Sequence, residues 1–335
     1  MKLVTYLDGK QEKLAILAGG YVYNMDDLHP GLPHHIKEFL ENWEDFLPIT
    51  QHGLLMISEG MGAATKGIPI EKVTLLSPVP HPTSCRDGYA FRQHVATARR
   101  NRGVPMIPEF DQYPVLYFTN HQSIKGPGEI PCMPDHFEKL DFELEVAVVI
   151  CKEGINISAE EADGYIGGLM VMNDFSARTL QMEEMKLNLG PCKGKDFATA
   201  LGPWLVTPDE LKGFEIPAKE GHTGKNWDLR MTAKINNQEV SRGSLGDMDW
   251  TFAELIERAS YGAAVFPGDV IGSGTVGTGC FMELNGTGRL QDRNYKDQWL
   301  QEGDRVELEV QGLGRLHNTI VKTPTDWSIL KKKKL

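Results

Sequence analysis

The segment DFELEVAVVI, residues 141–150, constrains the fold most strongly. Side chains alternate between the two faces of a β-strand, so one face of this segment would carry only apolar residues. These residues are Phe142, Leu144, Val146, Val148 and Ile150. The opposite face would carry Glu143, Glu145, Ala147 and Val149. Because apolar residues on both faces are typical of a strand covered on both sides, the sequence predicts a buried strand that also carries two neighbouring carboxylates.

The two glutamates need partners, because burying like charges without compensation is costly. Two interpretations are open from this segment. Each carboxylate could pair with a Lys or Arg, or the strand could lie at a sheet edge with that face in water. Alternatively, both could bind a divalent cation such as Mg²⁺, Ca²⁺ or Mn²⁺, all of which accept carboxylate oxygens. The second interpretation requires further acidic residues from elsewhere in the chain.

Composition excludes several classes of protein. The chain has 335 residues, of which 41% are hydrophobic and 24% charged, as in ordinary soluble proteins with more than one domain. Its net charge of −11 argues against a general nucleic-acid or anionic-membrane binder. No apolar run approaches the ~20 residues of a membrane span. The five cysteines are scattered without paired spacing, so we expect reduced, mostly buried thiols in a cytoplasmic protein.

The pattern of elements predicts two domains. Residues 1–77 combine short strands with a helical pattern, and the proline-rich segment SPVPHPTS follows as a linker. Residues 78–335 contain many β-rich segments and few helical patterns, notably SARTLQMEEMK and TFAELIERASYG. No G-x-G-x-x-G follows a strand, which disfavours a dinucleotide-binding fold. A β-rich α+β fold is therefore expected.

Ionisable residues stand out in four other segments. Asp174 follows the apolar run GGLMVM and could cap a helix or bind a ligand. Asp87 is expected in a turn, with His94 seven residues further on. Lys195 lies in a glycine-rich stretch, where exposure to water and a place in a site are both open. Glu283 lies within the apolar run CFMEL, where a histidine would be a natural partner.

Taken together, five segments resemble the motifs of the fumarylacetoacetate hydrolase family, and of its fumarylacetoacetase branch in particular. They are RDGYAFRQH, DFELEVAVVI, NDFSARTLQ, GKDFATALGPWLV and SGTVGTGCFMEL, in this order along the chain. The resemblance runs from about residue 80 to the C-terminus. It implies a mixed β-sandwich roll with a small N-terminal domain, and a homodimer.

The resemblance also implies a site, residue by residue. It implies four ligands for a divalent cation (Mg²⁺, Ca²⁺ or Mn²⁺), namely Asp87, Glu143, Glu145 and Asp174, with Lys195 and Thr199 around a further ion-binding loop. It implies a catalytic dyad of His94 and Glu283, assisted by Arg178 and Lys195. Four further residues would contact the substrate, namely Tyr89, Tyr117, Gln181 and Thr275. A shared cation would then explain the paired glutamates.

The implied reaction is hydrolysis of a carbon–carbon bond in a dicarboxylate β-diketone, most directly of fumarylacetoacetate in tyrosine breakdown. Two departures bear on the substrate. Met185 stands where the branch usually has a tyrosine, and Arg102 only approximately matches a substrate-binding arginine. The alternatives within the family are an acylpyruvate hydrolase and an oxaloacetate decarboxylase. A ligand-binding protein without catalysis is the alternative of another class, which the presence of both His94 and Glu283 disfavours.

Overall fold

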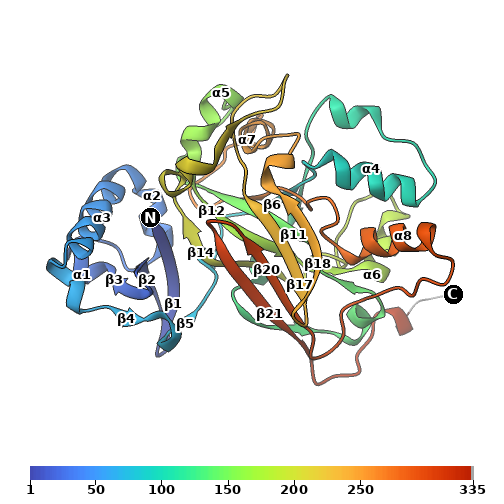
Figure 1. Ribbon diagram of the computed structural model, residues 1–335, viewed down its shortest axis with the longest axis horizontal. Coiled ribbons are helices and arrows are strands. Elements are labelled where there is room, and N and C mark those ends of the chain that lie inside the picture. Colours follow the sequence, from blue (N-terminus) through green and yellow to red (C-terminus); the bar gives the residue numbers. More distant parts are fainter. Residues whose placement is uncertain (333–335) are drawn as a thin grey trace.

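A computed structural model describes residues 1–332 of the chain. Within them, twelve strands form one large sheet (Figure 1). In spatial order its main path is β4 (Ile68–Pro69), β3 (Tyr21–Asn24), β2 (Gln11–Ala18), β1 (Lys2–Asp8), β14 (Thr199–Val206), β12 (Ile166–Asp174), β11 (Leu144–Ile150), β19 (Val270–Gly272), β6 (Cys85–Gly88) and β7 (Leu116–Thr119). Off this path, β5 (Thr74–Leu75) pairs with β1, and β8 (Ile124–Lys125) pairs with β14.

Most of the segment DFELEVAVVI forms β11, at the centre of this sheet. β11 pairs antiparallel with β12 on one side and with β19 on the other. All seven residues of β11 are fully buried. Leu144 and Val146 belong to one apolar core, whereas Ala147 and Val149 belong to another. The prediction of a strand covered on both sides is therefore confirmed, although the strand begins at Leu144 and not at residue 141.

A second sheet covers one face of the first. Its strands are, in order, β18 (Gln238–Ser244), β17 (Arg230–Ile235), β20 (Arg305–Val310), β21 (Gly314–Lys322) and β9 (Gly128–Cys132). Met231 and Leu308 of this sheet share a core with Val146 of β11. Two short pairs complete the strands, β10 (Leu140–Asp141) with β13 (Ser176–Ala177) and β15 (Glu215–Pro217) with β16 (Lys225–Trp227). The expected β-rich sandwich is thus present.

Helices lie at the ends and edges of these sheets. They are α1 (Met25–Leu28), α2 (Ile36–Glu41), α3 (Trp43–Ser58), α4 (Arg92–Asn101), α5 (Ala159–Ala162), α6 (Arg178–Met185), α7 (Phe252–Ser260) and α8 (Phe281–Gln291). The two helical patterns noted in the large domain are α6 and α7. Figure 1 shows α4, α6 and α8 at the end of the molecule opposite the N-terminal elements. None of the helices within residues 1–332 is long and apolar enough to cross a membrane.

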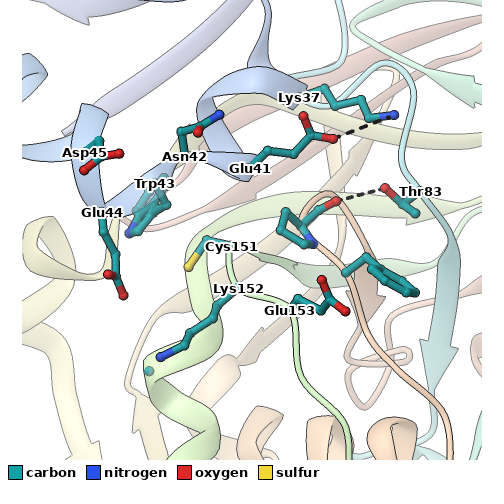
Figure 2. A pocket seen from close by; sticks show the side chains of 13 residues that line it. Lys37, Glu41, Asn42, Trp43, Glu44, Asp45, Thr83, Cys151, Lys152 and Glu153 are labelled. Atoms are coloured by element: carbon teal, nitrogen blue, oxygen red, sulfur yellow. Dashed lines mark hydrogen bonds and ion pairs between the residues drawn. The ribbon is translucent and has the colours of Figure 1, made fainter.

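The N-terminal elements continue the central sheet, because Lys2 and Leu3 of β1 pair with Val206 and Leu205 of β14. The predicted linker, residues 77–84, contains no strand or helix. The division at residue 77 stays a prediction. A cavity of about 670 Å³ lies beside α2 and α3, which face the loop after β11 (Figure 2). None of the predicted site residues lines this cavity.

Candidate active site

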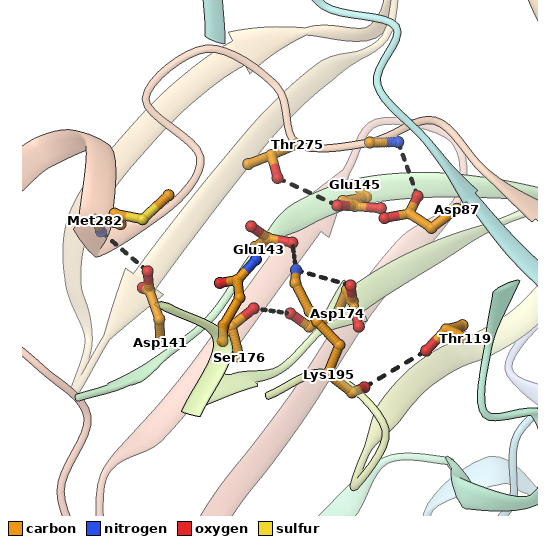
Figure 3. Close-up of polar contacts among 12 residues, drawn as sticks. Asp87, Thr119, Asp141, Glu143, Glu145, Asp174, Ser176, Lys195, Thr275 and Met282 are labelled. Atoms are coloured by element: carbon orange, nitrogen blue, oxygen red, sulfur yellow. Dashed lines mark hydrogen bonds and ion pairs between the residues drawn. The ribbon is translucent and has the colours of Figure 1, made fainter. Parts of the chain in front are cut away.

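Four buried carboxylates from three separate segments meet where neighbouring strands of the large sheet end (Figure 3). Asp87 in β6, Glu143 just before β11 and Glu145 in β11 each offer an oxygen atom, and these atoms lie within 4.8 Å of one another. β12 runs antiparallel to β11, so Asp174 at its C-terminal end reaches the same place. The structure therefore brings together the four residues that the resemblance implied as cation ligands.

Asp87 is fixed by the glycine-rich loop after β19. Its Oδ1 accepts hydrogen bonds from the backbone N–H groups of Gly88 (2.8 Å) and Gly274 (3.0 Å). Gly272 pairs directly with Asp87, and a Cβ atom at this glycine would overlap the same oxygen. The absence of a side chain at Gly272 therefore leaves room for the Asp87 carboxylate. Both of these hydrogen bonds are made by Oδ1, and Oδ2 takes part in neither.

The cluster lacks hydrogen-bond donors for some of its oxygens. Within residues 1–332, Glu145 Oε2 and Asp174 Oδ1 are buried without a hydrogen-bond partner. Such a group costs about 1–3 kcal/mol. Burial, reinforced by the charge of Asp174, raises the pKa of Asp87 to about 7. Burial and the neighbouring Asp87 likewise raise the pKa of Glu145. Unpartnered carboxylate oxygens are the donors that hard divalent cations prefer, so these residues fit such an ion.

Lys195 supplies a positive charge to this cluster. Its ammonium group donates to Glu143 and to Asp174 Oδ2 (2.8 Å). Burial alone would lower the pKa of Lys195, but the carboxylates of Asp174 and Glu143 raise it above its ordinary value. Burial would raise the pKa of Glu143, yet Lys195 and Arg178 lower it to about 2. Lys195 is therefore a buried ammonium ion, and Thr199 lies nearby, paired with Asp174 across β12 and β14.

A histidine and a glutamate form a close pair beside the cluster. His94 lies on α4 and Glu283 in the first turn of α8, and the two helices pack together. His94 Nδ1 lies 2.6 Å from Glu283 Oε2, and both side chains are buried. Asn101 also donates to the backbone carbonyl of Glu283 (3.0 Å), which ties α4 to α8. With Nδ1 held by the glutamate, Nε2 is the nitrogen available for proton transfer.

A single cavity of about 590 Å³ connects the pair to the carboxylate cluster. Most of the predicted site residues line it, namely Asp87, Tyr89, His94, Tyr117, Glu143, Arg178, Gln181, Lys195, Thr275 and Glu283. Glu145, Asp174 and Thr199 are not in its wall, and they lie behind it. Met185 and Arg102 line the cavity as well.

Several predicted substrate contacts are engaged with the cluster. Tyr117 donates to Asp174, and Thr275 donates to Glu145 (3.2 Å). Arg178 donates to Glu143 and to Gln181 Oε1 (2.9 Å). In this structure Tyr117, Thr275 and Arg178 hold the carboxylates in place, whereas Gln181 is bound to Arg178.

Arg102, unlike these residues, does not contact the carboxylate cluster. Within residues 1–332 it forms no ion pair, and its Nε donates to the carbonyl of Ala98 (3.1 Å). α4 explains its position, since His94, Ala98 and Arg102 are spaced four residues apart and so share one helix face.

The residues of the outer wall of the cavity were not predicted from the sequence. This wall is mainly apolar and includes Val95, Ala98, Ile107, Val115, Leu116, Met182 and Met282. Helical spacing from His94 could have indicated Ala98, but the other residues come from separate segments that only the fold brings together. Asp141 was also missed, although it lies two residues before Glu143 in the segment that drew attention to the site.

Comparison with known proteins agrees with this geometry. The sequence profile described as "Fumarylacetoacetate (FAA) hydrolase C-terminal" matches residues 83–321. The human mitochondrial oxaloacetate tautomerase FAHD2A is 29% identical over 306 residues, covering 90% of this chain and 85% of that protein. The fumarylacetoacetase of Oryza sativa subsp. japonica is 33% identical over 284 residues, covering 72% of this chain and 63% of that protein.

Solved structures share the fold. Maleylpyruvate hydrolase from Sphingobium sp. SYK-6, in complex with manganese (II) ion and pyruvate, superposes with a TM-score of 0.68 at 18% identity. The alignment covers 96% of this chain and 99% of that one. Profile, relatives and fold agree, and the chain belongs to the fumarylacetoacetate hydrolase family.

Proposed function

We propose that the protein is a metal-dependent hydrolase that cleaves a carbon–carbon bond of a β-diketo acid, with fumarylacetoacetate as the substrate and fumarate and acetoacetate as the products. The observation that carries this proposal is the position of the His94–Glu283 pair, which shares one cavity with the carboxylate cluster. A base beside a cation site suits the attack of water on a carbonyl group. The apolar outer wall gives room for a longer acyl chain than oxaloacetate carries.

Four residues would hold the cation, namely Asp87, Glu143, Glu145 and Asp174. Bound there, a divalent ion would supply Lewis-acid polarisation of the substrate's carbonyl oxygens. The manganese bound to the Sphingobium maleylpyruvate hydrolase supports Mn²⁺ as the ion to test first.

His94 would take a proton from water through Nε2, while Glu283 keeps the other ring proton on Nδ1 and stabilises the imidazolium. The water oxygen then bonds to the carbonyl carbon, and the carbonyl oxygen becomes an oxyanion. Lys195 uses two of its three N–H donors on carboxylates, so the third is available to the oxyanion. A well-placed donor is worth about 3–4 kcal/mol. Collapse breaks the carbon–carbon bond, and His94 returns the proton to the leaving carbon.

The anionic ends of the substrate need cationic or hydroxyl partners. Arg102 is suited to one carboxylate, because it lines the cavity and no carboxylate among residues 1–332 neutralises it. Tyr89 lies close enough for Arg102 to lower its pKa, although burial outweighs this effect and raises it. Met185 cannot donate a hydrogen bond as a tyrosine would. The loss costs about 1 kcal/mol, which weakens binding several-fold without changing the reaction.

A second candidate is oxaloacetate tautomerisation, which the names of several relatives favour, including two whose alignments cover 90% of this chain. The same pair could move a proton between carbon and oxygen of that substrate.

Comparing kcat/KM for fumarylacetoacetate, fumarylpyruvate and oxaloacetate on Mn²⁺-loaded protein separates the candidates. We expect fumarylacetoacetate to be the best substrate, seen as loss of diketone absorbance with release of fumarate. Faster turnover of fumarylpyruvate would point to an acylpyruvate hydrolase. If oxaloacetate alone reacts, tautomerisation or decarboxylation replaces the proposal, depending on whether CO₂ is released. If nothing reacts, a ligand-binding role is the better account.

A further inference from the structure

Asp141 is a fully buried carboxylate that belongs neither to the cation cluster nor to the His94–Glu283 pair. Its Oδ1 accepts the backbone N–H of Phe281 (2.7 Å). Its Oδ2 accepts the backbone N–H of Met282 (2.9 Å), as Figure 3 shows. Its Oδ2 also accepts from Arg178 Nε (2.8 Å). One carboxylate thus joins two helices, α8 through its backbone and α6 through its first residue.

Regular strand geometry would place Asp141 on the same face as Glu143 and Glu145, as a third acidic side chain in the cluster. The backbone prevents this. β10 ends at Asp141 and pairs with β13, whereas β11 begins only at Leu144. The break between the two strands turns the Asp141 carboxylate toward α6 and α8 instead of the cation cluster.

The contact with α8 bears on the catalytic pair. The first N–H groups of a helix lack intrahelical partners, and a negative charge there is stabilising. Asp141 binds two of these groups, those of Phe281 and Met282, and Glu283 is the next residue. The carboxylate therefore fixes where α8 begins and so where Glu283 meets His94.

The contact with Arg178 bears on the cation cluster. Arg178 Nη2 lies 2.8 Å from Asp141 Oδ2 and 2.8 Å from Glu143 Oε1. Asp141 therefore shares this guanidinium with a predicted cation ligand. Without Asp141, Arg178 would pair with Glu143 alone and would compete more strongly with a cation for its oxygens.

We propose that Asp141 is a positioning residue that couples the cation cluster to the His94–Glu283 pair. It acts on the cluster through Arg178 and on the pair through the first turn of α8. The inference rests on the proposed function only where turnover is measured. Its main test uses two properties that need no substrate.

The test compares Asp141→Asn with the unchanged full-length protein. Mn²⁺ affinity is measured from the electron paramagnetic resonance signal of free Mn²⁺. The His94 Nδ1–H proton is followed by NMR in histidine-labelled protein and assigned through its absence in His94→Gln. We expect Mn²⁺ binding to weaken about tenfold, as for other residues that orient metal ligands. We also expect the Nδ1–H resonance to shift or broaden, and turnover at saturating Mn²⁺ to fall by a similar factor.

Asp135→Asn is the matched control, because Asp135 is also a buried carboxylate that accepts two backbone N–H groups, those of Ile329 and Leu330. It should leave Mn²⁺ affinity and the His94 resonance unchanged. If Asp141 had a merely structural role, Asp141→Asn would lower the melting temperature but leave Mn²⁺ affinity and the His94 resonance of the folded protein unchanged. That result would overturn the inference. A change in only one property would overturn the coupling.

If Asp141→Asn does not fold, Asp141→Glu keeps the charge but displaces the carboxylate from both sets of partners. Both properties must then differ from those of the unchanged protein, and an unchanged Mn²⁺ affinity together with an unchanged His94 resonance would overturn the inference. Failure of the substrate panel would leave these two results unaffected.

Discussion

Replacing Glu145 by glutamine should change stability in opposite directions with and without a cation. Glu145 is fully buried in β11, and its Oε2 has no hydrogen-bond partner within residues 1–332. Its Oε1 accepts from Thr275 (3.2 Å). Without a cation, the substitution removes a buried negative charge beside Asp87 and supplies N–H donors in the same volume. With a cation, the same substitution removes a ligand.

The expected magnitudes follow from these contacts. Relieving one unsatisfied buried group stabilises the cation-free protein by about 1–3 kcal/mol. For 335 residues, an unfolding entropy of about 2.1 cal/mol/K per residue sums to about 0.7 kcal/mol/K, so Tm should rise by about 1.5–4 °C. A cation at a hundred times its Kd stabilises the unchanged protein by about 2.7 kcal/mol, which corresponds to about 4 °C. Glu145→Gln should lose most of that increment.

Differential scanning calorimetry on chelator-treated and Mn²⁺-loaded protein measures both effects. We expect Glu145→Gln to melt above the unchanged protein without Mn²⁺ and below or level with it at saturating Mn²⁺. Glu309→Gln, at a partly exposed ion pair with Arg315 on the second sheet, should show the normal Mn²⁺ increment. A full Mn²⁺ increment in Glu145→Gln would refute the assignment of Glu145 as a cation ligand.

Three further predictions concern other parts of the chain. His94→Ala should reduce turnover by about 10²–10⁴-fold with little change in Mn²⁺ affinity, and unchanged turnover would exclude it as the base. Gly272→Ala should cost about 1–3 kcal/mol in urea unfolding and weaken Mn²⁺ binding, because the added methyl group overlaps the Asp87 carboxylate, whereas Gly164→Ala meets no atom within 4 Å and should do neither. Burial lowers the pKa of His136 to about 4. Because the unfolded chain takes up this proton near pH 6.5 and the folded chain does not, the free energy of unfolding should fall by about 2–3 kcal/mol between pH 6.5 and 4. In His136→Gln, the free energy of unfolding measured in urea should fall by correspondingly less between pH 6.5 and 4. An equal decrease in both proteins would contradict the prediction.

Part of this architecture could be predicted because it depends on local periodicity. The alternation in residues 144–150 reports burial on both faces of β11, and the structure places the two faces in different cores. The helical spacing in residues 178–185 and 252–260 is equally local. Short apolar runs are ambiguous, because length and spacing cannot separate strand from helix. Glu283, noted within the run CFMEL, accordingly lies in the first turn of α8.

The site was harder to predict, since its members interact across long distances in sequence. No periodicity indicates that β10 ends at Asp141 and turns this carboxylate from Glu143 toward α8. Nor does the sequence of NDFSARTLQ show that Arg178 is held by carboxylates on both sides. Residue types can indicate which chemistry is present. Which oxygen faces which nitrogen depends on how the completed sheet brings separate loops together.

The cation cluster lowers the stability of the cation-free protein, whereas the apolar core of the sheet raises it. The core can therefore offset the cost of burying the cluster. Counting Asp141, five buried carboxylates face two cations, Lys195 and Arg178, which leaves excess negative charge in a buried place. Among residues 1–332, Glu145 and Asp174 each retain an unpartnered oxygen. The residues of β11 beyond Glu145 are apolar and fully buried on both faces, and they anchor this part of the backbone. The cation is therefore not needed to form the strand. For this reason we expect the double variant Glu143→Gln, Glu145→Gln to fold and yet to bind no Mn²⁺. Circular dichroism and Mn²⁺ titration measure the two properties separately, and a variant that unfolds would show that the carboxylates, and not only the apolar core, maintain the sheet.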